Sequence, residues 1–111
     1  MYMAIDFFIV NNEKQKTFSK TCVNFDEKLH DYLLEKESDN SFELLLELDL
    51  YSDRIFSTKE INSLIEICEA LLNKYRKGDK QEQEIRIFSR DLQNLCEKAL
   101  KQTKQVIAVG D

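Results

Sequence analysis

Two stripes of apolar residues in the second half of the chain constrain its fold more than any other feature. The first stripe follows Ser57 and Glu60, which match the S-x-x-E pattern of a helix capping box, and it stops before Gly78. Its members recur every three or four residues: Ile61, Leu64, Ile65, Cys68, Leu71, Leu72 and Tyr75. The second stripe has the same spacing: Ile85, Phe88, Leu92, Leu95, Cys96, Ala99 and Leu100. This spacing predicts two amphipathic helices packed as an antiparallel hairpin.

The two ends of the chain have a different pattern, in which aromatic and β-branched residues follow one another closely. The first ten residues include Tyr2, Ile5, Phe7, Phe8, Ile9 and Val10, and Asn11-Asn12 ends the run. Residues 105–109 contain a second such run, with Val106, Ile107 and Val109. Both runs predict strands, and we expect them to pair with each other. Because two strands alone are marginally stable, we expect helices to cover them.

Residues 18–36 allow two interpretations. Their apolar residues recur at intervals of three and four, which would make one helix from Phe18 onward. Alternatively, Asn24 caps a shorter helix that begins with Asp26 and Glu27, whose negative charges suit a helix N-terminus. We place this helix at 25–36.

The first part of the segment 42–56 is compatible with either a strand or a helix. The apolar residues Phe42, Leu44, Leu46 and Leu48 alternate as in a strand, but Phe42, Leu45 and Leu46 also fit one helical face. Leucine and glutamate favour a helix, no residue in this stretch is β-branched, and Asn40 with Glu43 resembles a capping box. We therefore predict a short helix at 42–48 and a loop at 49–56.

Composition is consistent with a folded chain. Hydrophobic residues make up 42% of the sequence and charged residues 33%, which is typical of a globular protein and not of a disordered one. There is no proline, and the only glycines are Gly78 and Gly110, so we expect long elements with few tight turns. We predict that residues 1–111 form a single α+β domain, predominantly helical, with four helices and a small sheet made from the N- and C-terminal strands.

The location of the protein follows from what the chain lacks. No apolar run approaches the roughly 20 residues that a membrane span needs. Residues 1–10 carry neither a basic segment nor a small-residue cleavage site of the kind found in signal peptides. We therefore expect a cytoplasmic protein.

The residue types needed for catalysis or metal binding are sparse. Cys22, Cys68 and Cys96 are far apart, and each falls among apolar residues, so we interpret them as reduced core side chains and predict no metal or cofactor. His30 is the only histidine, and it flanks the apolar stripe of its helix, which favours a residue at the edge of the core over a catalytic base. The many carboxylate pairs have the spacing of solvated helix surfaces. We expect a protein that is not an enzyme.

Charge is distributed unevenly along the chain, whose net charge is −5. Residues 26–69 contain 13 acidic and 4 basic residues, a net of −9, whereas residues 71–111 contain 6 acidic and 9 basic residues, a net of +3. An acidic surface repels phosphate backbones and speeds the capture of a basic protein. We therefore expect a protein partner with a basic surface and no direct binding to nucleic acid.

The candidate contact residues for such a partner are acidic residues in and after the short helix, together with a tyrosine that could anchor the contact. They are Glu43, Glu47, Asp49, Tyr51, Asp53, Glu66 and Glu69. A structural role remains open for two of them, because Tyr51 and Asp53 could fix the turn and cap the helix that follows. Exposed glutamates are also often present only for solubility.

The order of these features, an apolar strand, a helix at 25–34, an acidic link at 49–53, two amphipathic helices and a Val-Ile-Ala-Val-Gly-Asp end, resembles a known class. It is similar to small bacterial immunity proteins of contact-dependent growth inhibition and polymorphic toxin systems. Its most distinctive strings are residues 92–100 and 106–111.

That resemblance implies a cytosolic protein that binds and blocks the toxin domain of a sibling cell's effector, often a basic nuclease. It transfers no binding residue position by position. The alternatives are a small regulatory adaptor that docks on a host enzyme, and a hydrolase, which would need an enclosed polar pocket around His30.

Overall fold

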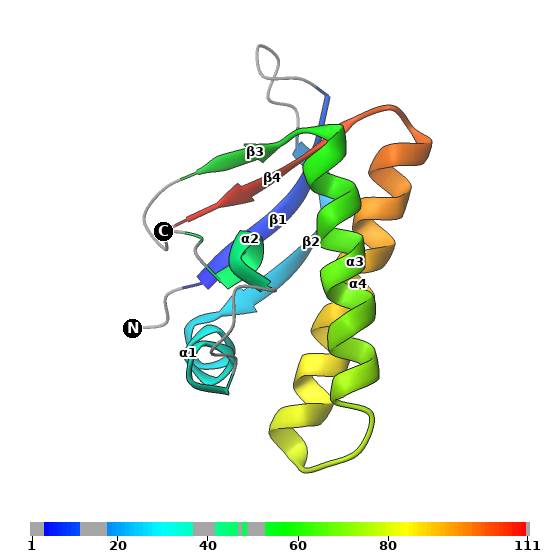
Figure 1. Ribbon diagram of the computed structural model, residues 1–111. Helices are drawn as coiled ribbons and strands as arrows, with labels where there is room; N and C mark the ends of the chain where they lie inside the picture. Colours follow the sequence, from blue (N-terminus) through cyan, green and yellow to red (C-terminus); the bar gives the residue numbers. More distant parts are fainter. Residues whose placement is uncertain (1–3, 12–17, 37–41, 47, 49–52, 111) are drawn as a thin grey trace.

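The computed structural model describes residues 4–11, 18–36, 42–46, 48 and 53–110. In these residues four helices accompany one four-stranded antiparallel sheet, so the predicted α+β class is confirmed. The strands are β1 (Ala4–Val10), β2 (Phe18–Asp26), β3 (Arg54–Phe56) and β4 (Gln105–Val109), in the sheet order β2-β1-β4-β3. The helices are α1 (Glu27–Lys36), α2 (Glu43–Leu46), α3 (Thr58–Lys74) and α4 (Lys80–Lys101). Figure 1 shows their arrangement.

The N- and C-terminal strands pair as predicted. Phe7 lies opposite Ala108, and Ile9 lies opposite Val106, in an antiparallel register that places β1 and β4 in the centre of the sheet. The sheet is larger than predicted, because β2 and β3 extend it on either side. The sheet therefore joins segments from both ends and the middle of the chain.

Strand β2 corrects the prediction for residues 18–26. The helix begins at Glu27, two residues later than predicted, and Asp26 caps it by accepting a hydrogen bond from the Leu29 N–H at 2.8 Å. In β2, Val23 and Phe25 are buried whereas Cys22 and Asn24 are exposed, which is the alternation of a half-buried strand. Pairing with β1 overrides the helical spacing, because it satisfies the backbone groups of both strands.

Strand β3 corrects the second part of the prediction for residues 49–56. A loop was expected there, but residues 54–56 pair with β4, Ile55 opposite Ile107 and Phe56 opposite Val106. Residues 49–52 lie outside the described part of the chain. Three residues are too few to show a strand pattern on their own, so the pairing partner decides the structure of this segment.

The hairpin of α3 and α4 confirms the clearest prediction. Ser57 Oγ accepts a hydrogen bond from the Glu60 N–H at 3.2 Å, and Glu60 Oε1 accepts one from the Ser57 N–H at 3.0 Å. Asp79 caps α4 in the same way, through the Glu82 N–H at 3.1 Å. Between the helices Gly78 has φ +142°, a backbone conformation that side chains larger than hydrogen rarely adopt. The two helices pack against each other along their length (Figure 1).

One hydrophobic core lies between the helices and a single face of the sheet. Ring contacts connect the two layers: Phe25 of β2 stacks on Phe88 of α4 with ring centroids 4.5 Å apart, and Phe7 of β1 lies 6.3 Å from both Phe56 and Phe88. All four helices contribute to this core, so the short helix predicted at 42–48 and observed at 43–46 belongs to it as well. The opposite face carries Asp6 and Asn24, whose side chains share a hydrogen bond of 2.8 Å.

The three cysteines are free, but they differ in position. Cys68 and Cys96 are fully buried, as predicted. Burial raises the pKa of both thiols well above the usual range, that of Cys96 to about 12. Cys22 is exposed, so the prediction of a core side chain is wrong for this residue. Its neighbours suggested a helical stripe, but in a strand every second residue points to the other face of the sheet.

Candidate functional site: an acidic groove between α2 and α3

A groove of about 480 Å³ lies between the short helix α2 and the first half of α3. We call it the α2–α3 groove, and we define it by the residues that line it. They are Phe42, Glu43, Leu44, Lys59, Glu60, Ser63, Glu66, Ile67 and Ala70. Phe42 and Ile67 are almost completely buried, whereas Glu43, Lys59 and Glu66 are exposed. The groove thus combines an apolar bottom with a charged rim.

The position of α2, and with it one wall of the groove, depends on a buried contact with α1. The His30 ring nitrogen Nε2 lies 2.7 Å from the carbonyl oxygen of Leu46, the last residue of α2. A carbonyl oxygen only accepts, so Nε2 carries the proton and donates. The His30 ring also packs edge-on against Phe25, with centroids 5.2 Å apart. Helix α2 has only four residues, so such contacts hold it in place where its own hydrogen bonds cannot.

His30 was expected at the edge of the core, but only 6% of it is exposed. His30 is buried because α2 packs over this side of α1 and covers the imidazole ring. The Leu46 carbonyl gives the buried ring a polar partner. His30 is not among the residues that line the α2–α3 groove.

The charges around the groove are only partly compensated. Glu60 forms an ion pair of 2.5 Å with Arg54 of β3. A hydrogen bond from the Ser57 backbone, followed by the interactions with Arg54, lowers the pKa of Glu60. Glu43 and Glu66 form no ion pair with any described residue, and Lys59 is the one basic side chain among the groove residues. Two carboxylates on facing helices therefore remain available to a basic group.

The structure brings together some of the predicted contact residues and separates others. Glu43 and Glu66 line the groove from opposite sides. Asp53 is exposed, but its carboxylate accepts a hydrogen bond from the Gly110 N–H at 3.2 Å and so fastens the end of β4 to the start of β3. Glu69 is exposed on α3 outside the groove. Glu47, Asp49 and Tyr51 lie outside the described residues.

The apolar residues of the groove were not among the predicted contact residues. Phe42 and Leu44 were considered only as apolar positions of the segment at 42–48, and Ile67 was not part of the predicted stripe, so nothing in their spacing indicates that they line an open groove. That Glu43 and Lys59 line the same groove also depends on how α2 is placed beside α3. A contact between residues on two helices joined by a long link has no signal in the local sequence pattern.

The described residues contain no group of three or more histidine, cysteine, aspartate or glutamate side chains arranged to hold a metal ion. Within the same residues, no helix has the length and apolar character required to cross a bilayer. Comparisons of the chain with protein-family models, with curated proteins and with solved structures give no match.

Proposed function

We propose that this protein is a bacterial immunity protein, which binds a basic toxin domain through the α2–α3 groove and neutralises it. The observation that supports the proposal is the presence of two carboxylates, Glu43 and Glu66, that form no ion pair with any described residue and line the rim of a groove with an apolar bottom. The proposal also rests on the resemblance in the order of elements described above. The toxin domain belongs to the class encoded beside immunity genes, and a nuclease is the chemistry that fits best.

The groove suits a lysine or arginine side chain of the partner. The long aliphatic stems of these residues pack on apolar surface while their charged ends remain beside a carboxylate or water. Phe42 and Ile67 provide the apolar surface, and Glu43 and Glu66 provide the negative charge at the rim. An arginine donates two parallel hydrogen bonds to a carboxylate, which would add geometric selectivity.

Blocking a nuclease requires no chemistry from the inhibitor. A nuclease holds its phosphate substrate with a cationic surface, so a protein with a suitably placed acidic surface competes for it. The acidic segment at 26–69 contains α1, α2 and the first part of α3, which places the groove in the most negative part of the sequence. The mechanism is therefore steric and electrostatic blockade, with the opposite charges also accelerating association.

Co-expression tests the proposal directly. The C-terminal domain of the protein encoded next to this gene is expressed in bacteria alone and together with this chain. We expect growth arrest in the first case and normal growth in the second, and a stable complex when the two are purified together. An adjacent domain that is not toxic, or a toxin that this chain does not silence, would count against immunity. Capture of a housekeeping enzyme in place of the toxin would favour the adaptor hypothesis.

Charge reversal then tests the groove. The double variant E43K/E66K places two positive charges at the rim, and we expect it to lose protection and to associate at least about tenfold more slowly at low salt. The matched control is E35K/E97K, which reverses two exposed glutamates on α1 and α4 outside the groove. If both double variants protect equally well, the toxin does not bind at this groove.

A further inference from the structure

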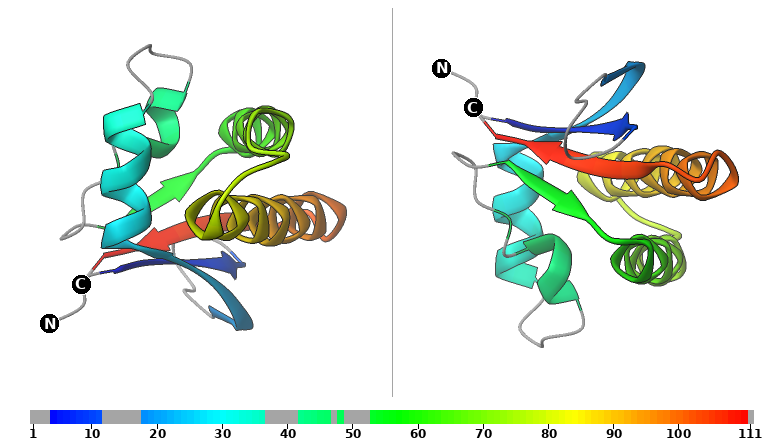
Figure 2. Two further views of the ribbon diagram at one scale, coloured as in Figure 1. Left: turned by 90° about the horizontal axis from the view of Figure 1, so that it is seen from below. Right: turned by 90° about the horizontal axis from the view of Figure 1, so that it is seen from above.

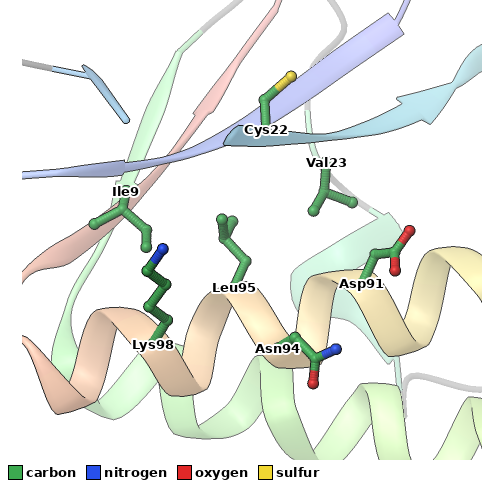
Figure 3. Close-up of a pocket in the computed structure, with 7 residues that line it drawn as sticks. All are labelled: Ile9, Cys22, Val23, Asp91, Asn94, Leu95 and Lys98. Atoms are coloured by element: carbon green, nitrogen blue, oxygen red, sulfur yellow. The ribbon is translucent and has the colours of Figure 1, made fainter. Parts of the chain in front are cut away.

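A second groove, of about 340 Å³, lies between α4 and the edge strand β2, and it shares no lining residue with the α2–α3 groove. The residues that line it are Ile9, Cys22, Val23, Asp91, Asn94, Leu95 and Lys98. Figure 3 shows Val23 and Leu95 pointing into the space between strand and helix, while Lys98 rises toward Ile9 and Asp91 stands near Val23. Ile9, Val23 and Leu95 are buried, and Asp91, Asn94 and Lys98 are exposed.

The strand beside this groove has an open edge. β2 is nine residues long and stands at the end of the sheet, and none of the described strands pairs with its second edge. Figure 2 shows β2 at the outer rim of the sheet in both views. A free edge presents unpaired N–H and C=O groups that can bind another strand, and proteins usually keep such edges short or shielded. The opposite edge, β3, has three residues and follows that rule.

The charges on the flank of α4 match a second copy of the same chain. Asp91 and Lys98 are seven residues apart, which places them on one side of the helix about 10 Å from each other along its axis. Neither forms an ion pair with a described residue. A two-fold axis perpendicular to the sheet, passing between them, would place Asp91 of each copy opposite Lys98 of the other. The same surface of α4 therefore supplies both the negative and the positive charge that a symmetric contact needs.

The same axis suits the strand. Two identical strands that pair in antiparallel fashion about a perpendicular two-fold axis keep the two faces of the sheet aligned, so both α4 helices would lie on one face. They would run in opposite directions, and their macrodipoles would attract each other. Figure 3 shows Cys22 on the part of β2 above the stretch of α4 between Asp91 and Lys98. The axis would therefore pass close to Cys22.

We propose that the protein forms a two-fold symmetric dimer in which β2 pairs with β2 of a second copy and Asp91 pairs with Lys98 across the interface. The result is an eight-stranded sheet with two α4 helices side by side. This dimer does not depend on the proposed function. It leaves the α2–α3 groove uncovered, because α3 packs over β3 and β4 at the other end of the sheet.

The first experiment measures mass by light scattering and sedimentation over a wide range of protein concentrations. We expect a dimer for the full chain. D91K and K98E should each place like charges opposite one another twice per dimer and weaken dimerisation at least about tenfold. The double variant D91K/K98E exchanges the two charges and should restore the dimer. The matched controls R90E and E97K reverse exposed charges on α4 outside the groove and should change nothing.

The second experiment uses Cys22 as a built-in probe. It is exposed, whereas Cys68 and Cys96 are buried in the core, so a short bifunctional thiol reagent should cross-link the native protein only through Cys22. We expect covalent dimers for the wild type and none for C22S, and few for D91K. A chain that is monomeric at every concentration would overturn the proposal. So would a dimer that neither single charge reversal weakens, because it would form through another surface.

The two proposals fail separately. D91K and K98E leave Glu43 and Glu66 unchanged, so protection against a toxin should persist in a monomeric variant. Conversely, E43K/E66K should lose protection and remain dimeric.

Discussion

At the scale of single residues, one buried side chain of the described structure is not satisfied. Ser89 of α4 is fully buried, and its hydroxyl has no hydrogen-bond partner. A buried hydroxyl without a partner has lost its hydrogen bonds to water and gained none in the protein, which costs about 1–3 kcal/mol. No described contact of Ser89 requires a polar side chain at this position.

Replacing this hydroxyl should therefore stabilise the protein. We expect S89A to raise the free energy of unfolding by about 1 kcal/mol, since alanine removes the unsatisfied oxygen and favours the helix. Urea denaturation of the two proteins measures the difference. A loss of stability in S89A would show that the hydroxyl has a bonding role after all.

Glu60 takes part in one local contact, within α3, and in one contact with a strand, β3. Its carboxylate closes the capping box of α3 and also pairs with Arg54 of β3. These contacts lower its pKa below the ordinary value of 4.5, so the ionised form is favoured in the folded protein. The capping box was predicted from sequence, but the ion pair was not, because it depends on β3 joining the sheet.

The stabilisation from Glu60 should depend on pH in a defined direction. Because its pKa is lowered on folding, the contribution is complete above the unfolded value of 4.5 and is lost as pH falls through the folded value. We expect E60A to be less stable than the wild type by about 0.5–1 kcal/mol at pH 7 and nearly equal to it near pH 2. Unfolding curves of the two proteins at several pH values test this, and a stability difference that stays constant from pH 7 to pH 2 would contradict it.

At the scale of elements, the shortest helix depends most on its neighbours. Four residues of α2 cannot form a stable helix alone, and its two buried leucines and the His30 bond hold it against α1 and α3. The helix was predicted correctly from composition, but its place beside α3, which creates the groove, was not. The position of α2 depends on the packing of its apolar face against the apolar faces of other elements, which the local sequence does not specify.

Removing the His30 contact should loosen α2. We expect H30A to lose about 2–3 kcal/mol of stability, because it leaves the Leu46 carbonyl without its donor and opens a cavity beside Phe25. H30Q keeps an N–H donor and should lose less. Urea denaturation gives the stabilities, and hydrogen exchange of residues 43–46 reports whether α2 opens first. Equal exchange in all three proteins would mean that other contacts hold α2.

At the scale of the whole molecule, the two ends of the sheet present different surfaces. The end with β3, α2 and α3 carries the acidic groove, and the end with β2 and α4 carries a flank with one acid and one base. In the two proposals, the first end binds a basic partner and the second end binds another copy of the chain.

Ionic strength should separate the two surfaces further. Association with a basic toxin domain should slow on the order of tenfold from low to physiological salt, because attraction between exposed charges is screened. Dimerisation should change less, since strand pairing contributes to it as well as charge. Stopped-flow association and sedimentation at matched salt concentrations measure the two. A toxin association rate that is insensitive to salt would contradict an electrostatic role for Glu43 and Glu66.

The amino-acid sequence by itself determined α3, α4, their caps and the pairing of β1 with β4. Periodic apolar residues and capping side chains act within a few positions, and the two terminal β-prone runs had each other as the obvious partner. Only the tertiary structure decided that residues 18–26 are a strand, that residues 54–56 pair with β4, and that His30 is buried. The physical reason is that backbone pairing and burial depend on segments distant in sequence, which can override a local helical spacing and which also form the groove between α2 and α3.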